Sequence, residues 1–386
     1  MKRIAVIFEG NVNQRMGVFN AVVNRVEHLS RIAPYKVDLF MIQVYDGAVM
    51  RLLRHSGNTP RTTEVTVGDT TIHMLWYKRS IADALRHRIL HRQPSDYLNW
   101  CSRMAWHFRG YDLVTAHDRL AAHLAALAGR QLDIPHFITW HGSDIHTAPQ
   151  HDDMVRKATI DLLKGSTCNF FVSQAIEAQA RMLAGDIHSQ ILPNGVRPDF
   201  KRLSDAEREQ LRKQYDVGHD EKVVAFVGNL LPVKNIDALP HIFDRIREIY
   251  TEHPVQCWVV GDGPLRRRVE GKCRCWGQQD AQSMPSIMNA IDVLVLPSHN
   301  EGLPLVVLEA MACGASVVAT HVGGIADAIG QENVIEKNDQ LVENMAQRVA
   351  LVLRQGARKT LPARFNWATT ATLENDIYSQ YLNQQP

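Results

Sequence analysis

The chain has 386 residues, too many for one hydrophobic core of ordinary size and suited to two domains of about 150–200 residues each. Hydrophobic residues make up 45% and charged residues 22%, a balance that excludes a disordered or fibrous chain. The formal net charge of +2 gives no support for a nucleic-acid binder. No apolar run approaches the ~20 residues that span a bilayer, so no transmembrane segment is expected.

The N-terminal segment and the cysteines together indicate a cytoplasmic protein. The chain begins MKRIAVIFEG, with basic residues before a short apolar run. That run ends at Glu9 without a small-residue cleavage site, so it predicts a first strand and not a signal peptide. The six cysteines are scattered and form no C-x-x-C pair. This favours reduced, mostly buried thiols over a zinc site or a disulfide framework.

Short apolar runs alternate with helical stretches along the whole chain. The runs predicted as strands are 4–8, 37–42, 72–76, 113–116, 137–140, 170–173, 223–227, 257–260, 293–296 and 317–319. Continuous apolar strands separated by helices are typical of parallel sheets that are buried on both faces. The sequence therefore predicts an α/β protein with two doubly wound, Rossmann-like domains.

The domain boundary is predicted near the turn signal Leu192-Pro-Asn-Gly195, which a strongly charged stretch follows. We assign residues 1–196 to an N-terminal domain and 197–364 to a C-terminal domain. Residues 365–386 have a helical pattern that begins at Trp367, and we expect this helix to return to the N-terminal domain.

The strongest functional signal follows the strand predicted at 293–296. The segment reads EGLPLVVLEAMACG from Glu301, with Pro304 placed to start a helix and Gly314 placed to end it. Ligands of open α/β sheets bind beyond the carboxyl ends of the strands, so Glu301 and Glu309 lie where a hydroxyl-rich ligand would bind. The alternative, that Glu309 is a solvated helix residue, fits poorly with its apolar neighbours.

This segment, with the SVVATHVGG that follows it, resembles the signature of the family 4 glycosyltransferases. The resemblance implies the glycosyltransferase-B fold, in which two Rossmann-like domains face each other across a cleft. It also implies retaining transfer of a sugar from a nucleotide donor to an acceptor. In this family the second glutamate holds the donor ribose, which points to Glu309. The first contacts the transferred sugar together with nearby backbone amides, which points to Glu301, Gly302 and Leu303.

Further segments of the C-terminal half resemble the same family. FVGNLLPVKN resembles its diphosphate-binding segment, which assigns Lys234 to the leaving diphosphate. Outside this context a solvated surface lysine would be the better interpretation. Asn229 stands where the family usually has arginine, so an amide would replace a guanidinium there. VVGDGP resembles the glycine-rich turn near the base and assigns Gly263 to the donor site. From Gly263 to Gly277 the chain is shorter than the usual helix and strand, so an unusual base-binding wall is expected.

In the N-terminal half, TWHGSD resembles the family's His-Gly segment. The resemblance implies that His141 contacts the donor sugar or supports catalysis, although an isolated histidine is more often structural. Gly17, after Met16, best fits the family's glycine loop near the diphosphate. The predicted catalytic residues are therefore His141, Lys234 and Glu301.

The chain lacks a D-x-D motif of the kind that binds a metal–diphosphate, so neither a metal nor another cofactor is expected. The resemblance implies a nucleotide-sugar donor and a glycan or lipid-linked acceptor, in bacterial surface polysaccharide synthesis. Two alternatives remain open: a sugar-nucleotide epimerase of the same two-domain plan, and a non-catalytic nucleotide-sugar binder. A nicotinamide-dependent dehydrogenase would have a G-x-G-x-x-G after its first strand, which is absent after Phe8.

Residues 78–109 predict a possible membrane contact. Seven lysines and arginines stand there against two aspartates, and aromatic and aliphatic residues are interleaved with them. A basic amphipathic surface of this kind binds anionic lipids, which would place the protein peripherally on the inner face of the cytoplasmic membrane. The alternative interpretation is a buried apolar face with solvated charges.

Overall fold

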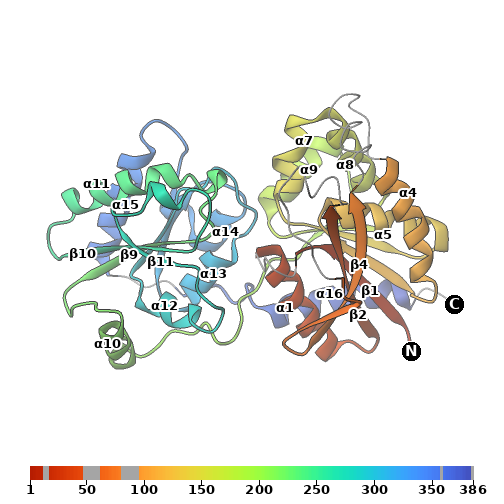
Figure 1. Ribbon diagram of the computed structural model, residues 1–386, viewed down its shortest axis with the longest axis horizontal. Helices are drawn as coiled ribbons and strands as arrows, with labels where there is room; N and C mark the ends of the chain where they lie inside the picture. The colour runs from red at the N-terminus through yellow and green to blue at the C-terminus, as the bar shows by residue number, and fades with distance from the viewer. Residues whose placement is uncertain (12–16, 47–60, 80–94, 357–359, 384–386) are drawn as a thin grey trace. The chain divides into compact units, whose positions relative to one another are not determined.

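The computed structural model describes residues 1–11, 17–46, 61–79, 95–356 and 360–383. The chain forms two compact units, one of Met1–Asn194 with Trp367–Pro386 and the other of Gly195–Asn366. Each unit is built on one β-sheet with helices packed against it (Figure 1). The structural boundaries fall at 194/195 and 366/367, against 196/197 and 364/365 from the sequence. The predicted α/β fold class is confirmed.

The sheet of unit 1 has the order β3-β4-β2-β1-β5-β6-β7-β8. Its strands are β1 (Arg3–Glu9), β2 (Lys36–Asp46), β3 (Glu64–Val67), β4 (Thr70–Arg79), β5 (Leu113–His117), β6 (His136–Trp140), β7 (Cys168–Phe171) and β8 (Ser189–Ile191). All pairs are parallel except β3 with β4. The short edge strands β3 and β8 were not predicted, because neither has a continuous apolar run.

Helices cover both faces of this sheet. The helical elements of unit 1 are α1 (Gly17–Ile32), α4 (Ser95–Met104), η1 (Ala105–Phe108), α5 (Arg119–Leu132), α6 (Ser143–His146), α7 (Ala148–His151), α8 (Asp153–Gly165), α9 (Gln174–Ala184) and α16 (Trp367–Leu382). Alternate residues of β1, namely Ile4, Val6 and Phe8, join one buried cluster with side chains of α1 and α16. Since successive side chains of a strand point to opposite faces, the other residues of β1 face α5, which also contacts β1.

The C-terminal helix α16 is fixed to unit 1 by a buried ion pair. The guanidinium Nε of Arg25, on α1, donates to Oε2 of Glu374 at 2.5 Å, and the two side chains are only 3% and 2% exposed. Tyr378 donates to the other carboxylate oxygen at 2.6 Å. Thr370 donates to the carbonyl oxygen of Pro193 at 2.8 Å. A charge left without its partner here would be costly, so these contacts define how α16 docks.

The sheet of unit 2 has six parallel strands in the order β11-β10-β9-β12-β13-β14. They are β9 (Lys222–Val227), β10 (Val255–Val260), β11 (Arg274–Gly277), β12 (Val293–Leu296), β13 (Ser316–Thr320) and β14 (Val334–Ile335). The helical elements are α10 (Asp205–Gln214), η2 (Pro232–Lys234), η3 (Ile236–Ala238), α11 (Leu239–Ile249), η4 (Arg266–Arg268), α12 (Met284–Ala290), α13 (Leu305–Ala312), α14 (Ile325–Ile329), η5 (Gln331–Asn333) and α15 (Leu341–Gln355).

The shortened segment between Gly263 and Gly277 keeps its strand. The run Arg274–Gly277 pairs in parallel with β10, while the helix before it is reduced to the single turn η4. The rings of Trp276 and Trp258 pack edge to face, with centroids 5.1 Å apart, which joins β11 to β10.

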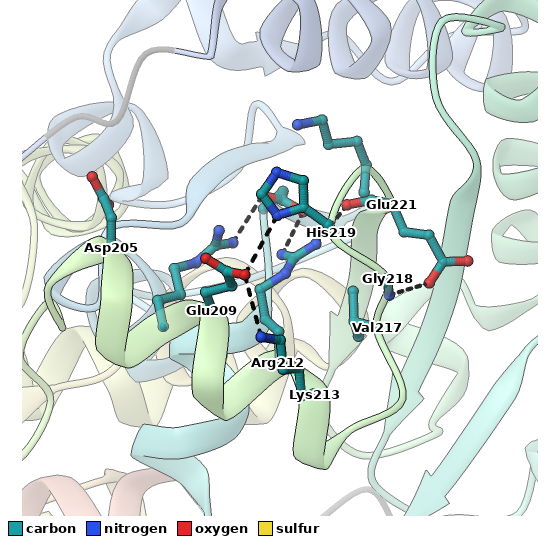
Figure 2. Close-up of a pocket in the computed structure, with 11 residues that line it drawn as sticks. Asp205, Glu209, Arg212, Lys213, Val217, Gly218, His219 and Glu221 are labelled. Carbon is teal, nitrogen blue, oxygen red and sulfur yellow. Dashed lines mark hydrogen bonds and ion pairs between the residues drawn. The ribbon is translucent and has the colours of Figure 1, made fainter.

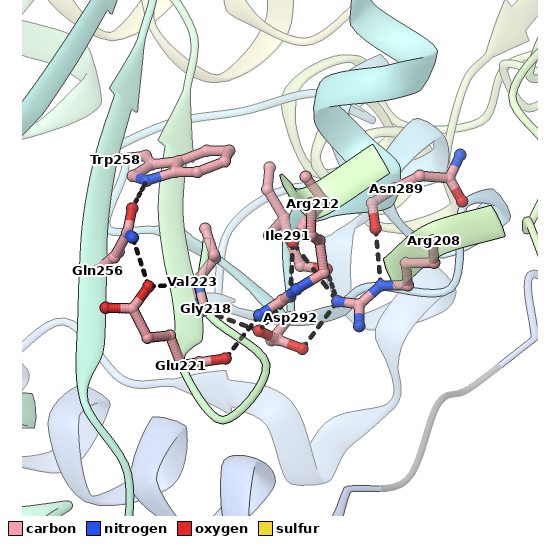
Figure 3. A network of polar contacts seen from close by, with 11 residues as sticks. Arg208, Arg212, Gly218, Glu221, Val223, Gln256, Trp258, Asn289, Ile291 and Asp292 are labelled. Carbon is pink, nitrogen blue, oxygen red and sulfur yellow. Dashed lines mark hydrogen bonds and ion pairs between the residues drawn. The ribbon is translucent and has the colours of Figure 1, made fainter. Parts of the chain in front are cut away.

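A polar network joins α10 to the amino-terminal ends of β9 and β12 (Figure 3). The carboxylate of Asp292 accepts from Arg208 at 2.8 Å and from Arg212 at 2.9 Å, and it also accepts from the backbone N–H of Val223 at 2.7 Å. Burial by itself raises the pKa of Asp292, but the two guanidiniums outweigh it and lower the pKa. The charged sequence of α10 thus serves to attach that helix to the sheet.

In the part of the chain that the structure describes, no helix is long and apolar enough to cross a bilayer. Within the same residues, no group of three or more histidine, cysteine or acidic side chains is arranged to hold a metal ion. The six cysteines are all free, and four of them are buried.

Candidate active site

Lys234 and Glu301 meet beyond the carboxyl ends of two neighbouring strands in unit 2. The loop after β9 carries Lys234, and the loop after β12 carries Glu301. Because β9 and β12 are adjacent and parallel, both loops emerge at the same edge of the sheet. The Nζ of Lys234 lies 2.6 Å from Oε1 of Glu301, and the two side chains are 20% and 8% exposed. Two residues predicted separately from sequence therefore form one charged pair.

The loop that carries Glu301 is held by backbone contacts on both sides. The N–H of His299 donates to the carbonyl oxygen of Val233 at 2.8 Å, which ties the loop to that of Lys234. On the other side, the N–H of Gly324 donates to the carbonyl oxygen of Gly302 at 2.6 Å. A Cβ on Gly323 would lie 2.2 Å from the carbonyl oxygen of Glu301, and its φ is +54°. Only glycine allows this close approach.

Glu309 lies on α13, which begins just after this loop. Burial raises the pKa of its carboxyl to about 7, with a smaller lowering effect from Arg197 and a raising effect from Asp199. Asp199 and Arg197 are themselves an ion pair, at 2.8 Å. Because the buried carboxyl of Glu309 is poorly solvated, hydrogen-bond donors of a ligand would interact with it strongly.

The remaining predicted residues of unit 2 line the same edge of the sheet. Asn229 lies two residues beyond the end of β9, and Leu303, two residues after Glu301, is buried. Gly263 follows β10, where a Cβ would lie 2.7 Å from the carbonyl oxygen of Leu230. This close packing is by itself a structural reason for glycine. Contact of Asn229, Gly263, Gly302 and Leu303 with a donor stays a prediction.

In unit 1, His141 follows β6 and lies against His117, the last residue of β5. The Nδ1 of His117 and the Nε2 of His141 are 3.1 Å apart, and the rings stack with centroids 5.3 Å apart. Burial, together with the charge of Arg25, lowers the pKa of His141 to about 3. Burial, Arg25 and His141 likewise lower the pKa of His117 well below its usual value. Both rings are therefore neutral at pH 7.

Three carboxyl groups gather at the same edge of unit 1. Glu9 ends β1, Asp118 follows β5, and Asp144 lies after β6. The backbone N–H of Glu9 donates to Asp118 at 2.7 Å, and that of Ala121 donates to its other oxygen at 2.9 Å. Burial raises the pKa of all three carboxyls, and mutual repulsion adds to it for Glu9 and Asp118. Arg119 opposes the rise for Glu9 and Asp144.

Sequence reasoning did not select His117, Glu9 or Asp118 as site residues. The signal was present, since each ends or follows an apolar strand, as does His141. Gly17 is the first residue of α1, and a Cβ there would meet no atom of the described chain within 4 Å. Packing thus gives no reason for glycine at this position, and its contact with a ligand stays a prediction. Met16 lies outside the described residues.

A pocket of about 230 Å³ in unit 2 lies away from these residues (Figure 2). It is lined by α10 and by the chain that leads into β9, including Arg212, His219 and Glu221. These residues precede the strands, so the pocket belongs to the amino-terminal edge of the sheet. The predicted donor residues lie at the opposite, carboxyl edge. The pocket is therefore not part of the candidate site.

The predicted basic surface at 78–109 falls mostly outside the described residues, which omit 80–94. In the described part, Tyr97 is buried and its ring stacks on that of Trp100, with centroids 5.7 Å apart. Trp106 is half exposed, and the guanidinium of Arg109 lies 4.9 Å from its ring centroid. Of the four described tyrosine, tryptophan and phenylalanine residues here, Tyr97 and Phe108 therefore belong to the core, and Trp100 is partly buried.

Comparisons with known proteins agree with this arrangement. A family model described as glycosyltransferase family 4 matches residues 57–200, and one described as glycosyl transferases group 1 matches residues 221–355. TuaC of Bacillus subtilis, whose name assigns it to teichuronic acid biosynthesis as a glycosyltransferase, is 27% identical over 240 residues. That alignment covers 62% of this chain and 60% of TuaC, so it spans less than two thirds of that relative.

Solved structures show the same fold over the whole chain. Sucrose-phosphate synthase from Thermosynechococcus elongatus has a TM-score of 0.75 at 20% identity, covering 98% of this chain and 99% of its own. HepE from Anabaena, solved in complex with UDP, has a TM-score of 0.67 at 19% identity, covering 100% and 98%. Two α/β units of this topology form the glycosyltransferase-B fold. The chain belongs to the family 4 glycosyltransferases, which confirms the resemblance inferred from its motifs.

The raised pKa of Glu309 predicts a pH-dependent stability. The folded-state pKa of about 7 exceeds the ordinary value of 4.5, so the folded protein retains a proton that the unfolded chain releases. The folded state is stabilised by this retained proton; the effect is complete below about pH 4.5 and is lost as the pH rises through 7. We expect Glu309→Gln to be more stable than the wild type at pH 8 by about 1–2 kcal/mol, and equally stable at about pH 4.

Urea unfolding at the two pH values measures this difference. Glu209→Gln, on α10 with a half-exposed carboxylate, is the matched control and should change stability little at either pH. A Glu309→Gln variant that is less stable than the wild type at pH 8 would contradict the assigned environment.

Proposed function

We propose that the protein transfers a sugar, with retention of configuration and without a metal ion, from a nucleotide-sugar donor to a carbohydrate or lipid-linked acceptor. The observation that carries the proposal is the pairing of Lys234 with Glu301 at the carboxyl edge of unit 2, beside α13 and Glu309. Synthesis of a bacterial surface polysaccharide is the setting that the name of TuaC supports. Solved structures of HepE hold UDP and UDP-glucose, which supports a nucleotide-sugar as the donor.

In this proposal the residues of unit 2 hold the donor. The carboxylate of Glu309 accepts hydrogen bonds from the ribose hydroxyls, since it is poorly solvated without a ligand. Lys234 stabilises the negative charge that develops on the diphosphate as the bond from the sugar to the phosphate oxygen breaks. Further hydrogen bonds to the nucleotide sugar come from the backbone amides of Gly302 and Leu303 and from Asn229. Gly263 and Gly17 allow the backbone to approach it closely.

Glu301 is a positioning group in this mechanism and not a covalent nucleophile. Its carboxylate is already engaged by the ammonium of Lys234 at 2.6 Å and is only 8% exposed. A carboxylate held by a cation is a weak nucleophile, but it is well oriented to accept from a sugar hydroxyl. The departing phosphate oxygen then takes the proton of the acceptor hydroxyl, as that hydroxyl attacks the anomeric carbon from the same face.

In the same proposal, residues of unit 1 form hydrogen bonds with the donor sugar and with the acceptor. His141 offers a neutral ring nitrogen to the donor sugar. Glu9, Asp118 and Asp144 offer carboxyl groups whose raised pKa reflects missing solvation. Hydroxyl groups of an acceptor would supply the hydrogen bonds that solvent does not, which favours a polyhydroxylated acceptor.

The first test is a thermal-shift screen with UDP-glucose, GDP-mannose and ADP-glucose. A ligand that binds only the folded state raises the melting temperature, so one of the three should do so. Glu309→Ala should weaken that donor by about 1.5–3 kcal/mol in calorimetry, the usual loss for a hydrogen bond to a charged group.

Glu209→Ala is the matched control, which should bind the same donor as the wild type does. Unchanged donor affinity in a folded Glu309→Ala protein would disprove the ribose assignment. Conversion of the donor to another nucleotide sugar, with no acceptor present, would instead support an epimerase. Donor binding without any transfer would support a non-catalytic binder.

The second test concerns metal independence. Turnover should be unchanged by EDTA, because Lys234 supplies the positive charge that a metal ion provides in other transferases. Lys234→Ala should lower kcat by about 10²–10³-fold, the usual effect of removing one group that stabilises developing charge. Full loss of wild-type activity in EDTA, restored by Mg²⁺ or Mn²⁺, would overturn this part of the proposal.

We also propose that the protein works on the inner face of the cytoplasmic membrane, bound peripherally through residues 78–109. The support is the basic composition of that segment, since each basic residue near an anionic surface contributes ~1 kcal/mol. The protein should co-sediment with phosphatidylglycerol vesicles at low salt and dissociate at high salt. Equal binding to neutral vesicles, or none at low salt, would favour a soluble acceptor and a solely cytoplasmic protein.

A further inference from the structure

Two adjacent strands of unit 1 bring the side chains of His117 and His141 into contact. β5 and β6 are adjacent parallel strands, and His117 lies opposite Thr139 in their register. His141 is two residues beyond Thr139, so its side chain points to the same side of the chain. The two rings meet through a single contact of 3.1 Å between Nδ1 of His117 and Nε2 of His141.

A buried cation lies close enough to both rings to disfavour a charge on either. Arg25 comes from α1, and its guanidinium is shared with Glu374 of α16 through Nε. Its Nη2 is buried and has no hydrogen-bond partner among the described residues. The charge of Arg25 lowers the pKa of both histidines, as does their burial.

Two neutral imidazoles joined by one hydrogen bond share a single proton at that contact, so one ring donates and the other accepts. The tautomer of His141 is consequently tied to that of His117. Nε2 of His141 is occupied by this bond. Within the described residues Nδ1 of His141 carries no hydrogen bond, which leaves it as the ring nitrogen for a ligand.

We propose that His117 is a positioning residue that acts through His141: its Nδ1–H donates to Nε2 of His141, which fixes the ring orientation and the tautomer in which His141 presents a protonated Nδ1 to the donor sugar. The proposal rests on the function proposed above for His141. An unrestrained neutral histidine exchanges between two tautomers and rotates about its side-chain bonds, so it offers a donor for only part of the time. A partner on the other nitrogen removes this freedom, as partners of metal-bound and catalytic histidines do.

Two substitutions of His117 separate the hydrogen bond from the packing. His117→Phe keeps a flat ring that can stack on His141 but has no nitrogen. His117→Asn loses the ring, but its amide nitrogen lies near the place of Nδ1 and can restore the bond. His123→Phe is the matched control, because His123 is another partly buried histidine of unit 1 whose pKa is lowered by burial and which does not contact His141.

The spectroscopic test needs no substrate. In long-range ¹H–¹⁵N spectra of histidine-labelled protein at pH 7, the signals of His141 are identified by their loss in His141→Gln. Wild type, His117→Asn and His123→Phe should show His141 as a single tautomer, with one protonated and one unprotonated nitrogen. His117→Phe should show the averaged nitrogen signals of a ring in tautomer exchange. Unchanged His141 signals in His117→Phe would overturn the proposal.

The kinetic test uses whichever of UDP-glucose, GDP-mannose and ADP-glucose gives the largest melting shift. His117→Phe should lower kcat about tenfold, the factor that one net hydrogen bond supplies, with little change in the donor KM. His117→Asn should recover most of this loss, and His123→Phe should match the wild type. A normal kcat in His117→Phe, despite altered His141 signals, would overturn the catalytic part of the proposal. Absence of turnover in the wild type would count against the proposed function, while the spectra would still decide the positioning.

Discussion

All strands of a parallel sheet end at the same edge, and this constraint determines where the functional groups of this protein lie. In unit 2 it brings Lys234 and Glu301 to 2.6 Å from each other, although they are 67 residues apart in the chain. In unit 1 it brings His117 beside His141 by the same geometry. Neither pair needs a special local structure. Each follows from two adjacent strands and the first polar residues at or beyond their ends.

The buried charges of both units divide into two kinds. Asp292 pairs with Arg208 and Arg212 and attaches α10 to the sheet of unit 2. Glu374 pairs with Arg25 and attaches α16 to α1. Such pairs contribute more to the uniqueness of the packing than to net stability. Glu309, Glu9 and Asp118 are different, because burial raises their pKa and nearby cations do not compensate. Poorly solvated carboxyls of this kind are typical of binding sites.

Arg25 links the structural and the functional groups of unit 1. It pairs with the C-terminal helix, and its charge adds to burial in lowering the pKa of His117 and His141. Helix α16 belongs to unit 1 through this ion pair and through its apolar contacts with α1.

The sequence alone determined the two α/β domains and ten of the described strands, because continuous apolar runs are local patterns. It also pointed to most of the residues at the carboxyl edge of unit 2, because the Glu301–Gly314 segment is a local pattern too. It did not reveal β3, β8, β11 or β14, which are short and are stabilised by their neighbours in the sheet. It also predicted an unusual base-binding wall between Gly263 and Gly277, where the structure has the single turn η4 followed by the strand β11. The pairing of Lys234 with Glu301, the raised pKa of Glu309 and the neutral histidine pair were decided only by tertiary structure. Each depends on which strands are adjacent and on which charges are buried together, and no local pattern encodes distances between residues that far apart in the chain.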